Sequence, residues 1–562
     1  MLKFIKNKRR NIFSLLFYVF IIVVFIMPIL RLVIMSLKTA NGYNITNYIY
    51  LLNEGRTVAA IKNTIIIGGV STLISLILGG IFAFIIAYSN IKRKKLIELL
   101  IILPFIIPSY IITISWSNLL SSNGFINSML NNLSIKPLNI YSITGIILVL
   151  GICNMPVVYL ITVNMLRKIP KDLEWASRAS GYNKWQTLYK VNLPQVMPAL
   201  VGGGILAFLS SIDNFAVPAF LGISSGIPVL STYIYEKAIG FGPSSFNYAA
   251  TLSVILSIIA IGGTVIQSLL VKKSSNLDSM KDDYSYRFEF SNVNGILLEA
   301  VSFIFLAFIN IVPIITMIIS SFQSAYGVKV TLQTMSLKNY IFLISNKRVL
   351  MSIVNSLFLA AVASIICILI GTAIAYIKIR KNSEAVKLGE LGATLTYGVP
   401  GIVLALAMIF HWVEPFPGIR PDIYGTIKIL IIAYITRYLI LQIKGSTTAI
   451  IGIEPALEEA ARVFGASKIK LWIKIIIPLI LKQVLSSAFL IYISAMTELT
   501  LSSMLASAGT KTIGLTIFNF QQAGNYNISS AMSTIIVLLV LGIYFIPRIT
   551  EVKKFRRSKY VN

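Results

Sequence analysis

The apolar positions of this chain gather in long blocks separated by short polar stretches. A helix needs about 20 predominantly apolar residues to cross a bilayer. On that rule, the first part of the chain predicts spans near 12–36, 60–88, 97–120, 141–165, 196–222 and 247–271. The remainder predicts spans near 294–320, 350–377, 388–411, 425–443, 482–505 and 529–549. The pattern therefore predicts an all-α integral membrane protein with about twelve transmembrane helices.

One polar stretch between apolar blocks occurs twice, as LEWASRASGYNKWQTLYKVNLP (173–194) and LEEAARVFGASKIKLWIKIIIP (457–478). Matched residues lie a constant 284 positions apart, which is close to half of the 562 residues. Further landmarks repeat at a spacing of 292: Asn63 and Pro108 match Asn355 and Pro400. Such repetition predicts two fused copies of one unit.

We therefore expect two homologous six-helix halves, residues 1–290 and 291–562. The polar stretch 272–294, rich in Ser, Asp and Lys, is the natural linker between them. The two copies of the repeated stretch, with the residues that lead into them, are called loop 1 (170–194) and loop 2 (455–478). Each half then contains one of these loops between its fourth and fifth spans.

Prolines and glycines give each loop the pattern of two short helices with a corner between them. Pro170 and Pro455 suit a first helical position, where the missing N–H costs nothing. Gly181 and Gly465 suit the position just past a helix end, which often needs a positive φ. The first helix of each loop is therefore expected to end at its glycine.

The second short helix of each loop has its own start and stop signals. Asn183 and Ser467 occupy matching positions, and both are good N-cap residues. Pro194 and Pro478 follow at matching positions, so this helix is expected to stop or kink there.

The composition agrees with a membrane protein, and the distribution of basic residues indicates its orientation in the membrane. The chain is 56% hydrophobic and 12% charged, with a mean hydropathy of +0.82, which excludes a soluble protein. The net charge of +29 does not indicate nucleic acid, because the basic residues lie in short runs beside apolar spans. With the N-terminus inside, most of the 49 Lys and Arg fall on the inner side. We therefore expect both termini and both loops in the cytoplasm.

The sequence lacks the common motifs for nucleotide binding, catalysis and metal binding. It holds no GxxxxGK[ST], GxSxG, HExxH or EF-hand pattern, and no CxxC or Cys/His cluster. We therefore expect no catalytic residue, no metal site and no cofactor bound by this chain. If ATP drives the protein, another chain binds it.

Two acids fall within predicted spans, where charge is costly and usually faces a cavity or a partner. They are Asp213 and Glu498, in the spans that follow loops 1 and 2. At the 284-residue spacing, Glu498 aligns with Asn214. One interpretation is that Asp213, Asn214 and Glu498 line a translocation path. The other is that they form hydrogen bonds between helices of the bundle.

Loops 1 and 2 resemble the EAA motif of ABC-importer permeases. That pattern has Glu-Ala-Ala, a glycine six residues after the Glu and a proline thirteen further on. Loop 2 fits it fully with Glu459, Ala460, Ala461, Gly465 and Pro478, preceded by Glu458. Loop 1 departs from it: Trp175 replaces the Glu, with Glu174 beside it, followed by Ala176, Ser177, Gly181 and Pro194. We consider Glu174 as the substitute for the missing acid.

In that family, the loop is a coupling helix that docks on an ATPase subunit. Twelve spans with two such loops resemble the fused permeases of the iron(III) importer group. The resemblance implies two ABC ATPase subunits, presumed to be a homodimer, and an external or periplasmic solute-binding protein. It also implies a multi-pass protein of the bacterial cytoplasmic (inner) membrane.

The resemblance favours iron(III) as the substrate and leaves other readings open. The same machinery serves 2-aminoethylphosphonate, thiamine or a polyamine in related permeases. An ion-coupled secondary transporter also has twelve spans and duplicated halves. A membrane scaffold or assembly factor is a further reading.

Overall fold

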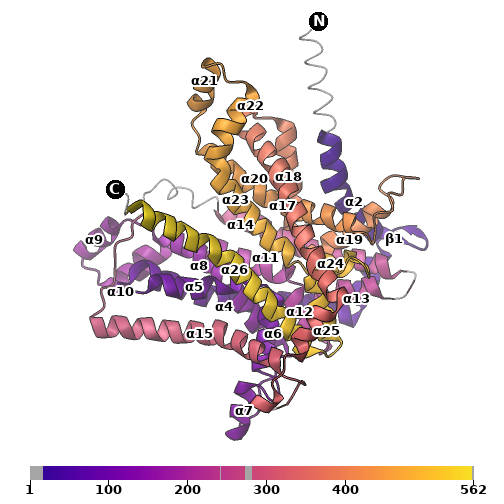
Figure 1. The fold of residues 1–562 in the computed structure, drawn as a ribbon, viewed down its shortest axis with the longest axis horizontal. Helices are drawn as coiled ribbons and strands as arrows, with labels where there is room; N and C mark the ends of the chain where they lie inside the picture. Colours follow the sequence, from indigo (N-terminus) through magenta and orange to yellow (C-terminus); the bar gives the residue numbers. More distant parts are fainter. Residues whose placement is uncertain (1–16, 241, 243, 272–281, 329, 560–562) are drawn as a thin grey trace. The chain divides into compact units, whose positions relative to one another are not determined.

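The computed structural model describes residues 17–559 apart from 241, 243, 272–281 and 329 (Figure 1). The basic N-terminal segment and residues 272–281 of the predicted linker thus lie outside the described residues. The chain forms two compact units by Cα proximity. Unit 1 comprises Met1–Asn53, Ile234–Ser257 and Lys347–Thr516, and unit 2 comprises Glu54–Tyr233, Ile258–Asn346 and Ile517–Asn562.

Unit 1 is helical apart from a short hairpin near its start, in which β1 (Lys38–Thr39) pairs antiparallel with β2 (Gly42–Tyr43). Its first helices are a π-helical turn η1 (Ile22–Ile26), α2 (Met27–Leu37) and α3 (Thr46–Asn53). The others are α17 (Lys347–Lys381), α18 (Glu384–Gly398), α19 (Gly401–Val413), α20 (Ile427–Ile451), α21 (Pro455–Val463), α22 (Lys468–Leu471), η5 (Trp472–Ile476), α23 (Ile477–Met496) and α24 (Thr500–Leu505).

The helices of unit 2 are α4 (Gly55–Tyr88), α5 (Lys94–Ile106), α6 (Ser109–Leu119), α7 (Phe125–Asn132), α8 (Ile143–Leu166), α9 (Lys171–Ala179), α10 (Lys184–Thr187), η2 (Leu188–Asn192), α11 (Leu193–Asp213), α12 (Ala216–Leu221), α15 (Asn292–Phe322), η4 (Leu332–Thr334), α16 (Lys338–Ser345) and α26 (Tyr526–Lys559). From α4 to α12, unit 2 has the order of helices that unit 1 has from α17 to α24, with α7 as an addition. Among the described residues, three helices are divided between the units: α13 (Leu230–Ile239), α14 (Ser245–Val271) and α25 (Ile513–Gln522).

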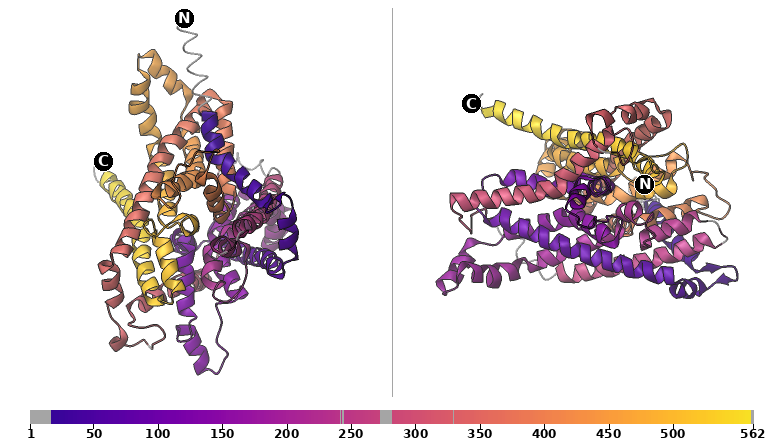
Figure 2. Two further views of the ribbon diagram at one scale, coloured as in Figure 1. Left: turned by 90° about the vertical axis from the view of Figure 1, so that its right-hand side faces the viewer. Right: turned by 90° about the horizontal axis from the view of Figure 1, so that it is seen from below.

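The first helix of each sequence half lies in the unit built mainly from the other half. Helix α2 packs against α19 in unit 1, and η1 packs against α18. Helix α15 packs against α5, α6 and α26 in unit 2 (Figures 1 and 2). The compact units are therefore not the two sequence halves. The repeat boundary near residue 290 stays a prediction from the sequence.

Two expected spans are sharply bent instead of continuous. Helices α5 and α6 meet at 104°, and α18 and α19 meet at 116°. The breaks lie at the matched prolines, Pro108 and Pro400, which cap α6 and α19. Proline pushes the preceding residue out of the helical region, and Ile107 and Val399 are extended, with ψ of 132° and 134°. Each of the spans expected near 97–120 and 388–411 therefore consists of two helices with a break at the proline.

The remaining spans agree with the apolar pattern. Nine helices within the described residues are long and apolar enough to cross a bilayer, or up to 11 spans if each bent pair is counted as one. Helix α20, which occupies the place of the span expected near 425–443, is not among them and carries Arg437. The all-helical membrane class is confirmed.

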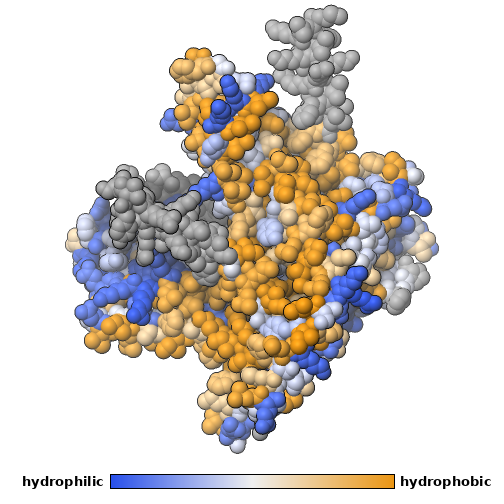
Figure 3. Space-filling view, viewed as in Figure 1, coloured by the Kyte–Doolittle hydropathy of each residue, from blue (hydrophilic) through white to orange (hydrophobic). Residues whose placement is uncertain are grey.

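The outer faces of the long helices are apolar. Val354, Phe358, Ile365 and Leu369 recur at helical spacing on α17, and each is about half exposed or more. Apolar residues likewise cover much of the face drawn in Figure 3, and hydrophilic residues lie mainly toward its edges, among them the region of α9 and α10. Exposed apolar side chains of this extent need lipid around them.

Candidate functional site

Loops 1 and 2 have the same local structure. In loop 1, α9 ends before Gly181 and α10 follows; in loop 2, α21 ends before Gly465 and α22 follows. Gly181 has a φ of +90° and Gly465 a φ of +77°, as the sequence predicted. Glycine adopts this left-handed conformation without the penalty that a Cβ imposes.

Each corner is closed by a Schellman motif. The N–H of Gly181 donates to Arg178 O, and that of Tyr182 donates to Ser177 O. In loop 2, the N–H of Gly465 donates to Arg462 O, and that of Ala466 donates to Ala461 O. These bonds satisfy carbonyls that a helix end otherwise leaves unpaired. The two corners are therefore fixed in the same geometry.

The second short helix of each loop is capped as predicted. The Asn183 side chain accepts from Gln186 N, and the Gln186 side chain accepts from Asn183 N, which completes a capping box. In loop 2, the Ser467 hydroxyl accepts from Lys470 N. Pro455 is the first residue of α21 as expected, whereas Pro170 lies one position earlier, as the N-cap of α9.

The second helices were expected to stop or kink at Pro194 and Pro478, and they do not stop there. Each runs on into a membrane span, over Lys184–Asp213 and Lys468–Met496. A five-residue π-helical turn, η2 or η5, precedes each proline. A π turn shifts the hydrogen bonds to the i−5 carbonyl, which accommodates the proline without ending the helix. Each corner is thus rigidly joined to a membrane helix.

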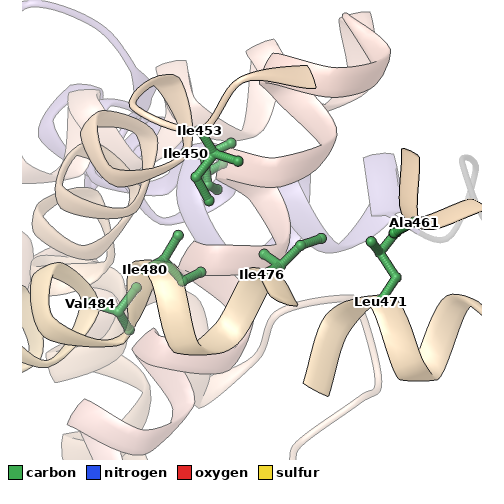
Figure 4. Packing of buried hydrophobic residues seen from close by; sticks show 8 residues of the cluster. Ile450, Ile453, Ala461, Leu471, Ile476, Ile480 and Val484 are labelled. Carbon is green, nitrogen blue, oxygen red and sulfur yellow. The ribbon is translucent and has the colours of Figure 1, made fainter. Parts of the chain in front are cut away.

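Loop 2 is held against the membrane helices by a buried apolar cluster. Ala461 of α21 and Leu471 of α22 close the corner, and Ile476, Ile480 and Val484 continue the cluster along η5 and α23 (Figure 4). Ile450 and Ile453, at the end of α20, complete the labelled set (Figure 4). Ring contact between Tyr376 of α17 and Trp472 adds to the packing, with centroids 4.7 Å apart.

The first acid of loop 2 faces the membrane helices. The Glu458 side chain is 5% exposed, and its Oε1 accepts from Arg380 Nε at 2.6 Å. Oε2 accepts from the Tyr376 hydroxyl at 2.8 Å and lies 3.5 Å from Arg462 Nη2. A buried carboxylate needs such partners, because an unpaired one is costly.

Glu174, the matching acid of loop 1, also faces inward. Its Oε1 lies 2.8 Å from Arg287 Nε, a poorly aligned ion pair, and accepts from Asn192 Nδ2 at 2.6 Å. The Arg287 side chain is 1% exposed. Asn192 also donates to the Tyr88 hydroxyl. From the sequence, we considered Glu174 as a docking acid, and that role stays a prediction. In the structure, its carboxylate contacts Arg287 and Asn192.

The exposed faces of the two loops differ in chemistry. In loop 1, Trp175 is 57% exposed and Ala176 lies beside it on the surface. In loop 2, the matching residues Glu459 and Ala460 are exposed. Other exposed aromatic residues of loop 1 are Tyr182, Trp185 and Tyr189. At the matched position, loop 1 therefore presents Trp175 where loop 2 presents Glu459, and loop 2 exposes Val463 and Phe464 elsewhere.

The polar residues proposed for a path lie at helix breaks and not inside continuous helices. Asp213 ends α11, and Glu498 lies between α23 and α24. Glu498 Oε1 accepts from Leu501 N at 2.9 Å, and Asn214 Oδ1 accepts from Val217 N at 2.9 Å. The two residues cap equivalent short helices, in agreement with their alignment. A role in a path stays a prediction.

Each of these caps has a second contact within its own unit. Asn214 Nδ2 donates to the Ser109 hydroxyl at 3.1 Å. Glu498 Oε2 accepts from the Tyr438 hydroxyl of α20. The Asn214 cap is therefore bonded to the start of α6 in unit 2, and the Glu498 cap is bonded to α20 in unit 1.

One intramembrane charge was not singled out from the sequence. Arg437 of α20 is 9% exposed, and its Nη1 donates to Val399 O at 2.6 Å. That carbonyl lies at the break before Pro400, where the helix leaves it without its usual partner. Because α18 and α20 are far apart in sequence, only their packing reveals this contact.

Comparison with known proteins finds one family twice in the chain. The family described as binding-protein-dependent transport system inner membrane component matches residues 75–276 and again residues 367–551. The two matches contain loop 1 and loop 2. They support the duplication that the sequence predicted.

Some relatives align with nearly the whole chain and others with about half of it, as a duplicated unit predicts. The ferric transport system permease protein FbpB of Actinobacillus pleuropneumoniae is 25% identical, covering 96% of this chain and 78% of the relative. The spermidine/putrescine transport system permease protein PotB of Haemophilus influenzae is 27% identical, covering 48% and 94%. The putative 2-aminoethylphosphonate transport system permease protein PhnU of Salmonella typhimurium is 26% identical, covering 46% and 90%.

Proposed function

Because the chain belongs to the family of binding-protein-dependent transport system inner membrane components, we propose that it is the permease of an ABC importer for iron(III). A solute-binding protein delivers the substrate from outside. Two ABC ATPase subunits, a homodimer in this proposal, dock on loops 1 and 2. The chain itself neither binds nor hydrolyses ATP. Both termini and both loops lie in the cytoplasm.

The observation that carries the docking proposal is the pair of matching corners, each continuous with a membrane helix. A docked subunit that moves α9 or α21 pulls on a membrane helix, since hydrogen bonds close each corner and the second short helix runs on into a span. Two such corners suit a pair of ATPase subunits. On loop 1, Trp175 is the docking contact, and on loop 2 it is Glu459.

Iron(III) is proposed because a ferric transport permease aligns with 96% of this chain. PotB and PhnU each align with less than half of it, so a polyamine or 2-aminoethylphosphonate is the second candidate. Thiamine follows on the family resemblance alone. An ion-coupled secondary transporter is the remaining alternative, and it would not need two docking corners.

The test is substrate-stimulated ATP hydrolysis by the chain reconstituted with the ATPase and binding protein encoded beside it. Ferric iron, 2-aminoethylphosphonate, spermidine and thiamine are offered in turn. Stimulation by ferric iron supports the proposal, and stimulation by another solute replaces iron with that solute. If no ATPase associates, or if uptake fails on collapse of the ion gradient while ATP is present, the importer proposal is wrong.

A further inference from the structure

The inward acids of the two loops are held by arginines from unrelated places in the chain. Arg380 lies in the last turn of α17. At the 292-residue spacing, the residue that matches Arg380 in the first half is Tyr88, at the end of α4. No arginine is therefore available there. Arg287 comes instead from the segment 282–291 that leads from the linker into α15.

Despite their origins, the two guanidinium groups bridge equivalent atoms. Arg380 contacts the Glu458 carboxylate, and its Nη2 donates to Ile453 O at 2.8 Å. Arg287 contacts the Glu174 carboxylate, and its Nη2 donates to Ile169 O at 2.8 Å. Ile169 and Ile453 match at the same 284-residue spacing as the two acids. Each arginine thus ties the first helix of its loop to the end of the preceding membrane helix.

The linker is built to place Arg287 there. The N–H groups of Arg287 and Phe288 both donate to Tyr88 O, and Asn90 and Phe290 exchange two hydrogen bonds. The Tyr88 ring lies under the guanidinium, 5.4 Å from centroid to Cζ. Backbone bonds and ring contact therefore fix the segment along the end of α4 on both sides of the arginine.

Asp283 secures the other end of this segment. Its Oδ2 accepts from Lys171 N, at the start of α9, and from Arg287 Nη2 at 3.1 Å. Burial alone would raise the pKa of this carboxyl, but hydrogen bonds from Ser285, Lys171 and Arg287 hold it well below its ordinary value. The carboxylate therefore stays ionised at neutral pH and adds a second link between linker and α9.

We propose that the linker segment 282–290 is a working part of the first coupling element. Arg287 makes for loop 1 the contacts that Arg380 makes for loop 2. Through these contacts, the segment transmits movement of α9 to α4 and α8. This inference rests on the proposed docking of an ATPase on loop 1. Arg287 is a positioning residue, since it acts through Glu174 and the backbone of α9 and touches no substrate.

The first experiment compares transport per ATP hydrolysed in proteoliposomes. Arg287→Ala is expected to retain basal ATP hydrolysis and to lose about tenfold or more in transport per ATP, because the pull on α9 no longer reaches the membrane helices. Arg380→Ala is expected to act alike through loop 2. The matched control is Arg93→Ala, whose side chain is 77% exposed and pairs with Glu299 at 3.5 Å. An unchanged transport ratio for Arg287→Ala would overturn the proposal.

A second experiment moves the arginine to another place in the chain. It tests whether coupling depends on the position of the guanidinium group or only on the presence of a positive charge. The double variant Tyr88→Arg with Arg287→Ala returns the guanidinium to the place that Arg380 holds in the second half, and it is expected to recover most of the coupling. Arg287→Lys keeps the charge without the planar fork that bridges two acceptors, so it is expected to remain impaired. Full coupling in Arg287→Lys, or no recovery in the double variant, would contradict the proposal.

A readout without the ATPase keeps this inference distinct from the proposed function. Hydrogen–deuterium exchange on the permease alone is expected to rise at 171–180 in Arg287→Ala and to stay unchanged in Arg93→Ala. If exchange rises but no ATPase ever associates, the tether is real and the proposed function is wrong. If ATPase coupling is normal and exchange does not change, the tether is wrong. If Arg287→Ala does not accumulate, the double variant and Arg287→Lys carry the same comparison.

Discussion

At the scale of single residues, the aligned pair Asn214 and Glu498 shows how one position serves both halves with different side chains. Both side-chain oxygens accept the N–H three residues on, at the start of a short helix. An amide oxygen and a carboxylate oxygen are equally able to accept that bond. The function that the two residues share is therefore to cap a short helix, and the negative charge of Glu498 is not part of that shared function.

Glu498 variants distinguish a cap from an acid in the path. Glu498→Ala removes the acceptor and is expected to destabilise the protein by about 0.5–2 kcal/mol and to lower transport. Glu498→Asn copies the first half and is expected to keep transport within about twofold of the parent, on the same capping argument. Transport and the thermal midpoint in detergent are the measurements. Equal loss in both variants would return the acid to a direct role in the path.

Gly465 gives a second prediction at this scale. Nothing lies within 4 Å of a Cβ added there, so Gly465→Ala meets no clash and only the positive φ opposes it. That strain costs about 1–2 kcal/mol, and the variant is expected to reach the membrane while substrate stimulation of ATP hydrolysis falls. Gly452→Ala is the control, since its φ is −70°. Equal stimulation in the two variants would show that the corner tolerates distortion.

At the scale of elements, the bent span α18–α19 depends on a side chain from another helix. The break at Pro400 frees Val399 O, and Arg437 of α20 donates to it. A buried acceptor left unpaired costs about 1–3 kcal/mol. The bend is therefore stable only while α20 is packed beside it.

Arg437→Met is accordingly expected to lower the stability of the detergent-solubilised protein by about 1–3 kcal/mol. Arg420→Met, which removes a side chain that is 71% exposed, is the control and is expected to change little. The thermal midpoint measures both. A variant Arg437→Met that melts with the parent would show that the break needs no donor from α20.

At the scale of the whole molecule, the two loops present different chemistry to the proposed ATPase pair. Contact through Glu459 is electrostatic and weakens with salt, whereas contact through Trp175 is mainly apolar and does not. Glu459→Ala is therefore expected to weaken ATPase binding severalfold at low salt and little at high salt. Trp175→Ala is expected to weaken it at both. Titration of the ATPase at two salt concentrations tests this, and identical salt profiles would contradict it.

The exchange of first helices between sequence halves leads to a prediction about assembly. Unit 1 needs α2 from the first half, and unit 2 needs α15 from the second. Residues 1–290 or 291–562 expressed alone are therefore expected to be unstable, whereas the two pieces expressed together should assemble. Membrane abundance and co-purification are the measurements. Stable accumulation of either piece alone would show that the exchanged helices are dispensable.

The local features of the fold follow from short stretches of the sequence. Blocks of apolar residues predict membrane helices because the bilayer leaves the backbone no other partners. Gly181 and Gly465 predicted the corners, and Asn183 and Ser467 predicted the caps, because these depend on one residue's own conformation or its nearest neighbours. The duplication followed from spacing alone. These signals are all contained within short stretches of chain.

The distant residues that complete those features are brought together by the packing of the helices and cannot be identified from the sequence. Pro194 was expected to stop or kink a helix, and the structure shows that the helix continues past it after a π turn. Glu174 was considered for docking, but its carboxylate meets Arg287, more than a hundred residues away, and nothing in the local pattern marks that pair. Arg287 and Arg380 do not align in sequence, yet they bridge equivalent atoms. A buried carboxylate requires a cation in space and not at a fixed place in the chain, so packing alone identifies which cation supplies it.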